Sequence, residues 1–372
     1  MLEIYDWLND SKFIKPLSPA CSMCSKGSKM VLFVTGVCYF DCFYCPLSFE
    51  KGGKDRIFAD EWELSDENDT EKIIQEAKYI KAKGAGITGG DPLLVWKRTK
   101  KYISLLKDEF GSDFHIHLYT KAIKNYQYID DLIYAGLDEI RFHPSINYWN
   151  NMDKNPLSKN IIDVINKDID VAIEIPVIPE MKNEILSLIK WSASNRINWV
   201  NINELEFSER NAEKFSLKKY VAKDDFSSSI LGSETTALEV LSKTSEKDYE
   251  IGVHYCSCSF KDGIQLTNRI IRRAKSIVKN HEVISKEGTL LKGIIYPQNE
   301  FTLKIIYKKL INDYKINNKK IFVNINKNRI EMKILELNKI ASKLADQGIF
   351  SFLIEEYPTA DGIEVEKIPL PI

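Results

Sequence analysis

The stretch that decides the fold is Met30-Val-Leu-Phe-Val-Thr35, followed by Gly36-Val-Cys38-Tyr-Phe-Asp-Cys42-Phe-Tyr-Cys45-Pro46. Its first part is an apolar run that predicts a buried strand, and Gly36 turns the chain at the end of that strand. Three cysteines with the spacing C-x3-C-x2-C then follow on one tight loop. A reactive loop at the C-terminal end of a buried parallel strand is where α/β barrels place their chemistry.

The spacing of this cysteine triplet indicates a cubane iron–sulfur cluster. Soft thiolate ligands hold iron well. A structural or electron-transfer cluster normally has four cysteine ligands, so three local ligands leave one iron open to bind another molecule. The alternatives are a zinc knuckle or three unrelated core cysteines. A zinc site of this spacing needs a fourth ligand close by, usually from a second C-x2-C or H-x-H pair.

This loop, with Tyr44 before the third cysteine, resembles the C-x3-C-x-aromatic-C signature of radical S-adenosylmethionine (SAM) enzymes. The resemblance implies a [4Fe-4S] cluster on Cys38, Cys42 and Cys45 whose open iron chelates the amino and carboxylate groups of SAM. It also implies that Tyr44 lies near the adenine. The compact triplet and Pro46 are similar to the group related to pyruvate formate-lyase-activating enzymes.

A second motif, Ile87-Thr-Gly-Gly-Asp-Pro92, follows about 45 residues later, at the end of the next expected strand. Adjacent glycines let backbone approach a ligand closely, and a carboxylate accepts hydrogen bonds from an ammonium group. By itself the motif is most often a turn. After the cysteine triplet it resembles the Gly-Gly-Glu-Pro motif of the same family, which implies that Gly89, Gly90 and Asp91 hold the amino group of SAM. Asp91 replaces the commoner glutamate with a shorter arm of the same charge.

The order of elements predicts an α/β fold, a partial (β/α)6 TIM-like barrel with a small C-terminal α+β domain. We expect an N-terminal extension with a C-x2-C pair over residues 1–25, the barrel over 26–255 and the C-terminal basic domain over 256–372. The expected strands are 31–35, 86–88, 115–119, 138–142, 171–176 and 200–206. The expected helices are 69–83, 94–109, 125–135, 159–168 and 182–195.

Polar residues lie at the ends of the expected strands, where a barrel presents its site. Of these, Thr120, Arg141, Glu174 and Asn203 are the strongest candidates for contact with SAM or substrate. The alternative for each is structural packing, because a polar residue inside a strand must find a partner in either role. No residue is singled out as catalytic.

The remaining four cysteines form two pairs, Cys21 with Cys24 and Cys256 with Cys258. A barrel with matched ends would bring both pairs together and complete a tetrahedral set for zinc or a second iron–sulfur cluster, with His254 as a substitute ligand. An iron–sulfur cluster is favoured over zinc, because the triplet already requires a supply of iron and sulfide. The alternative is that these reduced cysteines pack as small apolar residues.

Beyond Phe260 the charge changes. Residues 261–333 hold 17 Lys or Arg and 6 Asp or Glu, a net charge of +11, whereas the whole chain of 372 residues has a net charge of -1. This segment predicts a small α+β domain, with a ferredoxin-like arrangement as one option. A polyanion such as RNA is one partner that the charge would suit, and a solvated lysine face is the favoured alternative.

Composition sets outer limits on function. A hydrophobic share of 44% and a charged share of 28% are ordinary for a globular protein and exclude an acidic disordered chain. The longest apolar run, 30–40, is shorter than the roughly 20 residues that span a bilayer. The acidic start lacks the basic region of a signal peptide, so we expect a cytoplasmic protein without a membrane partner.

The expected function is that of an oxygen-sensitive radical SAM enzyme. The resemblance implies that reductive cleavage of SAM gives methionine and a 5′-deoxyadenosyl radical, which abstracts hydrogen from an unidentified substrate. It also implies an electron donor of the ferredoxin or flavodoxin type. The substrate is expected to be a small molecule or a protein rather than RNA. Modification of tRNA, and a non-catalytic iron–sulfur or zinc-binding role, are the alternatives. The closing segment 356–366 resembles an archaeal branch of the activating-enzyme group.

Overall fold

The computed structural model describes residues 2–15, 17–225, 227–298 and 301–371. The chain divides into two compact units, Met1–Leu266 and Thr267–Ile372, which are described separately. The predicted boundary between residues 255 and 256 differs, because it falls inside a strand of the first unit. That strand and the residues up to Leu266 belong with the barrel.

The first unit is built on one sheet, in which eleven strands are described, in the order β1-β2-β11-β10-β9-β8-β7-β6-β3-β4-β5. The run from β3 to β11 is parallel throughout, so the chain adds one strand after each crossover. The parallel strands are β3 (Lys29–Phe33), β6 (Gly84–Thr88), β7 (His115–Thr120), β8 (Glu139–Phe142), β9 (Asp170–Val177), β10 (Trp199–Glu204) and β11 (Gly252–Cys256). The six predicted strands and the partial barrel are confirmed, and β11 is an addition to them.

Short antiparallel strands complete both edges of this sheet. At one edge the N-terminal hairpin of β1 (Ile4–Asp6) and β2 (Lys12–Ile14) pairs with β11. At the other edge β4 (Phe58–Ala59) and β5 (Trp62–Glu63) follow β3. The predicted N-terminal extension is therefore integral to the barrel sheet.

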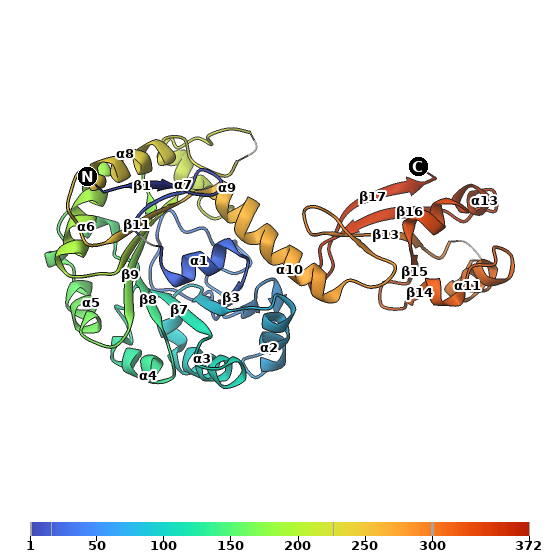
Figure 1. Ribbon diagram of the computed structural model, residues 1–372, viewed down its shortest axis with the longest axis horizontal. Helices are drawn as coiled ribbons and strands as arrows, with labels where there is room; N and C mark the ends of the chain where they lie inside the picture. The colour runs from blue at the N-terminus through green and yellow to red at the C-terminus, as the bar shows by residue number, and fades with distance from the viewer. Residues whose placement is uncertain (1, 16, 226, 299–300, 372) are drawn as a thin grey trace. The chain divides into compact units, whose positions relative to one another are not determined.

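Helices surround the sheet on its outer side (Figure 1). Their buried residues, such as Ile73 and Ala77 of α2, recur at helical spacing and pack into one core with the outward residues of the strands. The outer helices are α2 (Thr70–Tyr79), α3 (Trp96–Phe110), α4 (Ile129–Tyr134), α5 (Leu157–Ile165), α6 (Lys182–Ser194), α7 (Ala212–Leu217) and α8 (Ser233–Ser245). Shorter helical turns are η1 (Pro92–Val95), η2 (Tyr126–Tyr128), η3 (Ile146–Tyr148) and η4 (Met152–Lys154).

One helix, α1 (Pro19–Ser25), lies inside the ring of strands, as Figure 1 shows. Its N-cap residue Ser18 accepts a hydrogen bond from Arg141 of β8 over 2.9 Å, and α1 also contacts β3, β6 and β7. The chain closes this unit after β11 with α9 (Cys258–Phe260) and the turn η5 (Lys261–Leu266). The interior of the barrel, here called the lumen, is therefore partly filled by the N-terminal segment.

The second unit has the predicted α+β character. After α10 (Thr267–Ile277) and β12 (Val283–Ile284) its elements run β13 (Leu290–Ile295), α11 (Leu303–Asn312), η6 (Asn318–Lys320), β14 (Ile321–Asn324), β15 (Arg329–Met332), α12 (Ile334–Asn338), α13 (Ala341–Ala345), β16 (Ser351–Glu356) and β17 (Glu364–Leu370). The antiparallel order β14-β15-β13-β16 is that of a βαββαβ ferredoxin-like sheet, to which β17 is added.

The two faces of this second sheet differ in chemistry. Ile295, Ile330 and Met332 pack on one face with the apolar residues of α11, α12 and α13. Alternation places Arg329 and Glu331 on the other face, where both are fully buried. Arg329 donates to Glu331, Glu356 and Glu364 over 2.6 to 2.8 Å.

His281, Glu282 and Glu331 on this side offer ligand atoms within 4.8 Å of one another, the spacing of a metal site. The Lys292 ammonium already lies 2.7 Å from Glu282 and 2.6 Å from Glu356, so it supplies the positive charge at this position. The charged face is therefore a neutralised ion network rather than a cation site.

Replacing Arg329 by methionine is expected to destabilise the second unit by about 3–5 kcal/mol. The substitution leaves Glu331 and Glu356 buried without their guanidinium partner, and breaking a buried pair costs that much. Chemical denaturation of the full chain, followed by hydrogen exchange in residues 288–370, measures the loss. Lys320→Met removes an exposed ion pair with Glu336 and is the control, with an expected cost of about 0–1 kcal/mol. Equal effects of the two changes would contradict the network.

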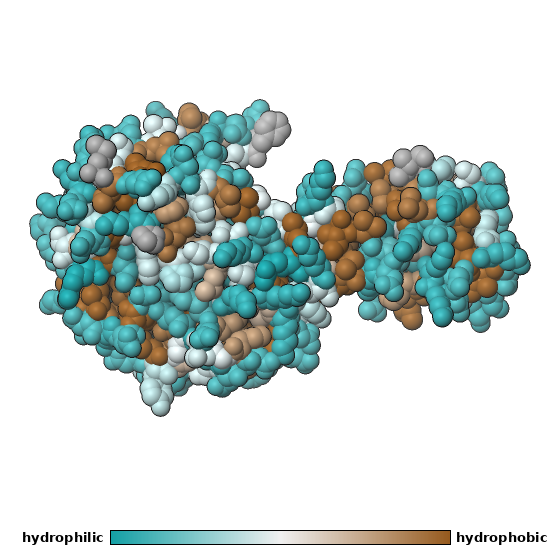
Figure 2. Space-filling view, in the orientation of Figure 1, coloured by the Kyte–Doolittle hydropathy of each residue, from teal (hydrophilic) through white to brown (hydrophobic). Residues whose placement is uncertain are grey.

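On the face shown in Figure 2, hydrophilic residues cover much of the surface and hydrophobic residues form separate patches. Among the described residues, we find no helix with the length and apolar character needed to cross a membrane.

Candidate functional site

The cysteine triplet lies on the loop that leaves β3. All three thiols are partly exposed, and none forms a disulfide. The loop folds back on itself, with the Cys45 N–H donating to the Cys42 carbonyl over 3.1 Å and the Phe40 N–H to the Cys38 sulfur over 3.4 Å. Burial raises the pKa of the Cys38 thiol, and Asp91 and Cys42 add to that rise.

The three thiols do not converge on a single-ion site. In the described part of this loop, no three ligand atoms of Cys, His, Asp or Glu lie within 4.8 Å of one another. Zinc–sulfur bonds of about 2.3 Å would place tetrahedral ligands roughly 3.8 Å apart. In an iron–sulfur cluster each thiolate binds a different iron, so wider spacing is expected.

The entry to this loop depends on a glycine. Gly36 donates to the Lys54 carbonyl and accepts from Gly53, each over 2.8 Å. A Cβ at position 36 would lie 1.7 Å from the Lys51 carbonyl oxygen, far inside any allowed contact. Only glycine lets the strand end and the 51–54 segment approach this closely.

The Gly-Gly-Asp motif is held directly against the start of the cysteine loop. Gly90 donates to the Thr35 carbonyl over 2.7 Å, and Asp91 donates to the Val37 carbonyl over 2.9 Å. A Cβ at Gly90 would lie 2.1 Å from the Val37 oxygen, so this contact also requires glycine. Two motifs that are distant in sequence are therefore joined through backbone atoms.

The Asp91 side chain is buried at the N-terminus of η1. Its carboxylate accepts from Thr120 Oγ1 over 2.7 Å, from the Leu93 N–H over 3.2 Å and from the Lys121 N–H over 3.3 Å. Burial raises the pKa of this carboxyl, and its donors oppose the rise. Two predicted site residues, Asp91 and Thr120, therefore form one contact.

Replacing Asp91 by alanine is expected to destabilise the barrel unit by about 1–3 kcal/mol, because three buried donors lose their acceptor. Denaturant unfolding of the variant measures this loss. Asp66→Ala is a matched control, since Asp66 accepts the Asn68 N–H in an exposed turn and its loss should cost about 0.5 kcal/mol or less. A variant at position 91 as stable as the control would contradict the buried role.

Tyr44, the aromatic residue of the triplet, is buried with its hydroxyl 2.8 Å from His143 Nε2. His143 Nδ1 lies 2.7 Å from the Glu174 carbonyl, which can only accept, so Nδ1 carries the proton and Nε2 accepts from Tyr44. Burial lowers the pKa of His143 to about 3, with Lys121 adding to the effect, so the ring is neutral. His143 was not among the predicted site residues, although it follows the end of β8.

Three other predicted residues form one network in the lumen. Glu174 accepts from Arg141 over 2.7 Å, from Asn203 over 2.9 Å and from Asn201 over 3.2 Å. Arg141 also donates to Glu139 over 2.6 Å and to Ser18, so its guanidinium is fully engaged. Sequence reasoning missed Ser18, for which the signal was an N-cap serine before Pro19.

The other four cysteines divide into two environments. Cys21 and Cys24 on α1 and Cys256 at the end of β11 lie in electrostatic reach of one another, whereas Cys258 lies 3.6 Å from Glu206. Burial raises the pKa of Cys24 to about 12. Such thiols are protonated unless a metal displaces the proton.

The segment after β10 packs against the cysteine loop from the other side. Ser208 donates to the Cys45 carbonyl over 3.3 Å, and Lys214 pairs with Asp41 over 2.6 Å. Tyr39, in this loop, and Phe49, shortly after it, remain 67% and 63% exposed. The cysteine loop is thus fixed through Asp41 and Cys45, while the side chains of Tyr39 and Phe49 are exposed.

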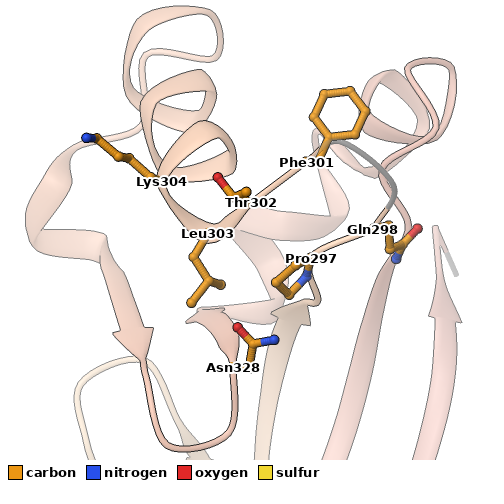
Figure 3. Close-up of a pocket in the computed structure, with 7 residues that line it drawn as sticks. All are labelled: Pro297, Gln298, Phe301, Thr302, Leu303, Lys304 and Asn328. Atoms are coloured by element: carbon orange, nitrogen blue, oxygen red, sulfur yellow. The ribbon is translucent and has the colours of Figure 1, made fainter.

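A separate hollow of about 450 Å³ lies within the second unit (Figure 3). Its lining includes Pro297, Leu303 and Asn328, and no cysteine, histidine or carboxylate is among the described lining residues. The described lining of this hollow therefore lacks the thiol and imidazole ligands of an iron–sulfur or zinc site.

Comparisons with known proteins match these observations. A family model described as the radical SAM superfamily matches residues 32–192, and one described as a domain of unknown function (DUF8061) matches residues 288–370. A protein of Methanocaldococcus jannaschii, a putative glycyl-radical enzyme activating enzyme, is 40% identical over 371 residues. That match spans 95% of this chain and 93% of the relative.

Two solved structures are also similar. SuiB of Streptococcus suis, bound to S-adenosylmethionine, is 12% identical with a TM-score of 0.44, over 63% of this chain and 51% of that chain. The radical SAM methyltransferase TsrM of Kitasatospora setae, with cobalamin and a [4Fe-4S] cluster bound, is 9% identical with a TM-score of 0.34. It covers 53% of this chain and 38% of that chain. The matched region thus spans about half of the SuiB chain and less than half of the TsrM chain.

Proposed function

We propose, from the premise that this chain belongs to the radical SAM superfamily, that it removes a hydrogen atom from a backbone glycine of a partner protein. Membership rests on the 40% identity along nearly the whole of both chains. The protein is therefore an enzyme with a [4Fe-4S] cluster and SAM as cofactors. When bound, these cofactors supply a 5′-deoxyadenosyl radical and methionine for one electron from a ferredoxin- or flavodoxin-type donor.

Cys38, Cys42 and Cys45 are the proposed cluster ligands. The observation that carries this assignment is the backbone pairing of Gly90 and Asp91 with Thr35 and Val37 at the base of the loop. This pairing supports the assignment, because it holds the glycine motif against the residue that precedes Cys38.

The neighbouring groups then have defined roles. Gly89 and Gly90 offer a backbone surface without side chains, Asp91 supplies a carboxylate beside the thiols, and Tyr44 presents a ring fixed by His143. Arg141, Glu174 and Asn203 form the polar lining of the lumen next to this surface. They orient bound groups through Glu174, whose side chain keeps 17% exposure.

The choice of a protein substrate is supported by the relative from M. jannaschii, whose name describes a putative activator of a glycyl-radical enzyme. That match covers 95% of this chain, so it includes the C-terminal domain. In the proposed step a Cα–H bond of glycine breaks homolytically. The hydrogen atom forms a new bond to the adenosyl C5′, which gives 5′-deoxyadenosine and a glycyl radical.

Deuterium transfer tests this substrate class. Cells of the source organism are grown with glycine deuterated at Cα, and their protein fraction and low-mass filtrate are separately incubated with the anaerobic enzyme, SAM and dithionite. Deuterium is expected in 5′-deoxyadenosine with the protein fraction. Deuterium with the filtrate alone would contradict a protein substrate, whereas no reductive cleavage in either would contradict the radical chemistry.

Modification of RNA has weaker support. The whole second unit, residues 267–372, holds 19 Lys or Arg and 12 Asp or Glu, a net charge of +7. Lys292, Arg329 and Arg273 are buried, and Lys292 and Arg329 bind carboxylates within the unit. Part of the positive charge is thus internal and cannot contact phosphate. Salt-sensitive tRNA binding would favour this alternative.

A further inference from the structure

The barrel lumen holds a second group of potential metal ligands. On β10, Asn201 and Asn203 face the lumen, because both side chains donate to Glu174. Their neighbours Val200 and Ile202 point the other way, into the core under the outer helices. This alternation fixes which residues of the adjacent strand face inward.

Two residues of β11 share the inward side. In the parallel register Asn201 lies beside His254, and Asn203 lies beside Cys256. Residues in register on neighbouring strands point to the same face. His254 and Cys256 therefore project toward the lumen, roughly 7 Å apart along the strand.

Helix α1 brings two further thiols to the same place. The Cys21 sulfur lies 3.9 Å from Asn201 Oδ1 and 3.6 Å from the Arg141 guanidinium. Cys24 follows at a spacing of three residues, which places it on the same helix face. Asn201 of β10 is the register partner of His254 on β11. The Cys21 thiol that contacts Asn201 therefore lies one strand away from the inward residues of β11.

His254 is the second observation that points to a ligand. The ring is 4% exposed, and neither nitrogen has a hydrogen-bond partner among the described residues. Its neighbours Trp7 and Phe260 pack edge-on and offer it no acceptor. A buried imidazole without partners is costly, and ligation of a metal would satisfy one nitrogen.

Basic groups lie near three of these thiols. Arg141 lies beside Cys21. Burial has the larger effect on the pKa of Cys24 and of Cys256 and raises both, whereas the charges of Lys29 and Lys261, respectively, lower them. Cys258 shares Lys261 with Cys256 but differs in its acidic neighbours, since its sulfur lies 3.6 Å from Glu206 Oε2 and 3.9 Å from the Glu204 carbonyl.

We propose that Cys21, Cys24, Cys256 and His254 hold a second iron–sulfur cluster in the lumen, separate from the cysteine triplet. Thiolate ligands suit an iron–sulfur cluster, and histidine replaces cysteine in some clusters. Cys258 is outside the ligand set. The proposal does not depend on the proposed substrate.

Metal analysis of a chain without the triplet tests this site. The Cys38→Ala/Cys42→Ala/Cys45→Ala chain is purified and reconstituted with iron and sulfide without oxygen. It is expected to retain at least about two irons with matching sulfide. Adding Cys256→Ala is expected to remove them, and adding Cys258→Ala to leave them in place. His254→Gln is expected to keep the iron but shift the electron paramagnetic resonance spectrum of the reduced cluster.

Four results would overturn the proposal in whole or in part. Absence of iron and sulfide from the triplet-free chain would exclude the second cluster. One bound zinc without sulfide would show that the site is a zinc site and not an iron–sulfur cluster. Iron lost with Cys258→Ala but kept with Cys256→Ala would refute the ligand set. An unchanged spectrum in His254→Gln would show that His254 does not belong to the ligand set. Circular dichroism and thermal unfolding of each variant check that it is folded. Cys21→Ser in the triplet-free chain tests the ligand on α1 in the same way and is expected to remove the iron.

Discussion

Cys42→Ala is expected to abolish the formation of 5′-deoxyadenosine from SAM under dithionite. Cys42 is the middle thiol of the triplet, and its carbonyl also accepts the Cys45 N–H. With two thiolates left on the loop, a cluster with one open iron cannot be held by three local ligands. The loss should therefore be complete rather than partial, and chromatography of the reaction products measures it.

Cys258→Ala is the matched control, because it removes a buried thiol that lies beside Glu206 and that belongs to neither proposed ligand set. This variant should cleave SAM at a rate close to that of the unmodified protein. Survival of cleavage in Cys42→Ala would refute the assignment of the triplet. Loss of cleavage in both variants would show that the assay reports general damage to the fold.

Gly36→Ala is the second change with a large expected effect. The added methyl would lie 1.7 Å from the Lys51 oxygen and 2.6 Å from the Lys54 oxygen, which both belong to the backbone. Neither oxygen is the mobile end of a side chain, so the 51–54 segment must move as a whole. We expect a destabilisation of about 2–3 kcal/mol and loss of triplet iron.

Thermal unfolding and iron content after reconstitution measure these two effects. Gly53→Asn is the control on the same segment. Gly53 has a φ of +78° with no atom within 4 Å of an added Cβ, and asparagine tolerates this left-handed conformation. Iron content should be unchanged in the control. A Gly36→Ala protein that binds iron normally would contradict the need for close approach.

The barrel could be predicted because its strands are strongly patterned. Met30–Thr35 and the later short runs are bounded by turn residues and alternate with helical stretches, which favours parallel strands. Strand β11 was missed because its inward positions carry His254 and Cys256, so that the sequence reads as a ligand motif rather than a strand. In the second unit, the residue pattern over 330–346 favours a helix. The structure has β15 (Arg329–Met332) at the start of this range, because pairing with β13 and β14 decides the conformation.

The glycine motif and the triplet were recognised from sequence, but their backbone contact was not. Hydrogen bonds from Gly90 and Asp91 to Thr35 and Val37 depend on the register of β3 with β6, which no local pattern encodes. The same holds for α1. Its entry into the lumen is set by Arg141 contacts with Ser18, across 123 positions of the chain.

The N-terminal hairpin has a consequence for solubility. Seven parallel strands leave β11 with one row of unpaired backbone donors and acceptors, and such an edge is a template for intermolecular pairing. Strand β2 occupies that row through Val253, His254 and Tyr255. The new outer strand, β1, is only three residues long and ends at a charged aspartate, which makes it a poor template. A chain that begins after Lys15 would therefore be prone to aggregate through β11 even where its catalytic loop is intact.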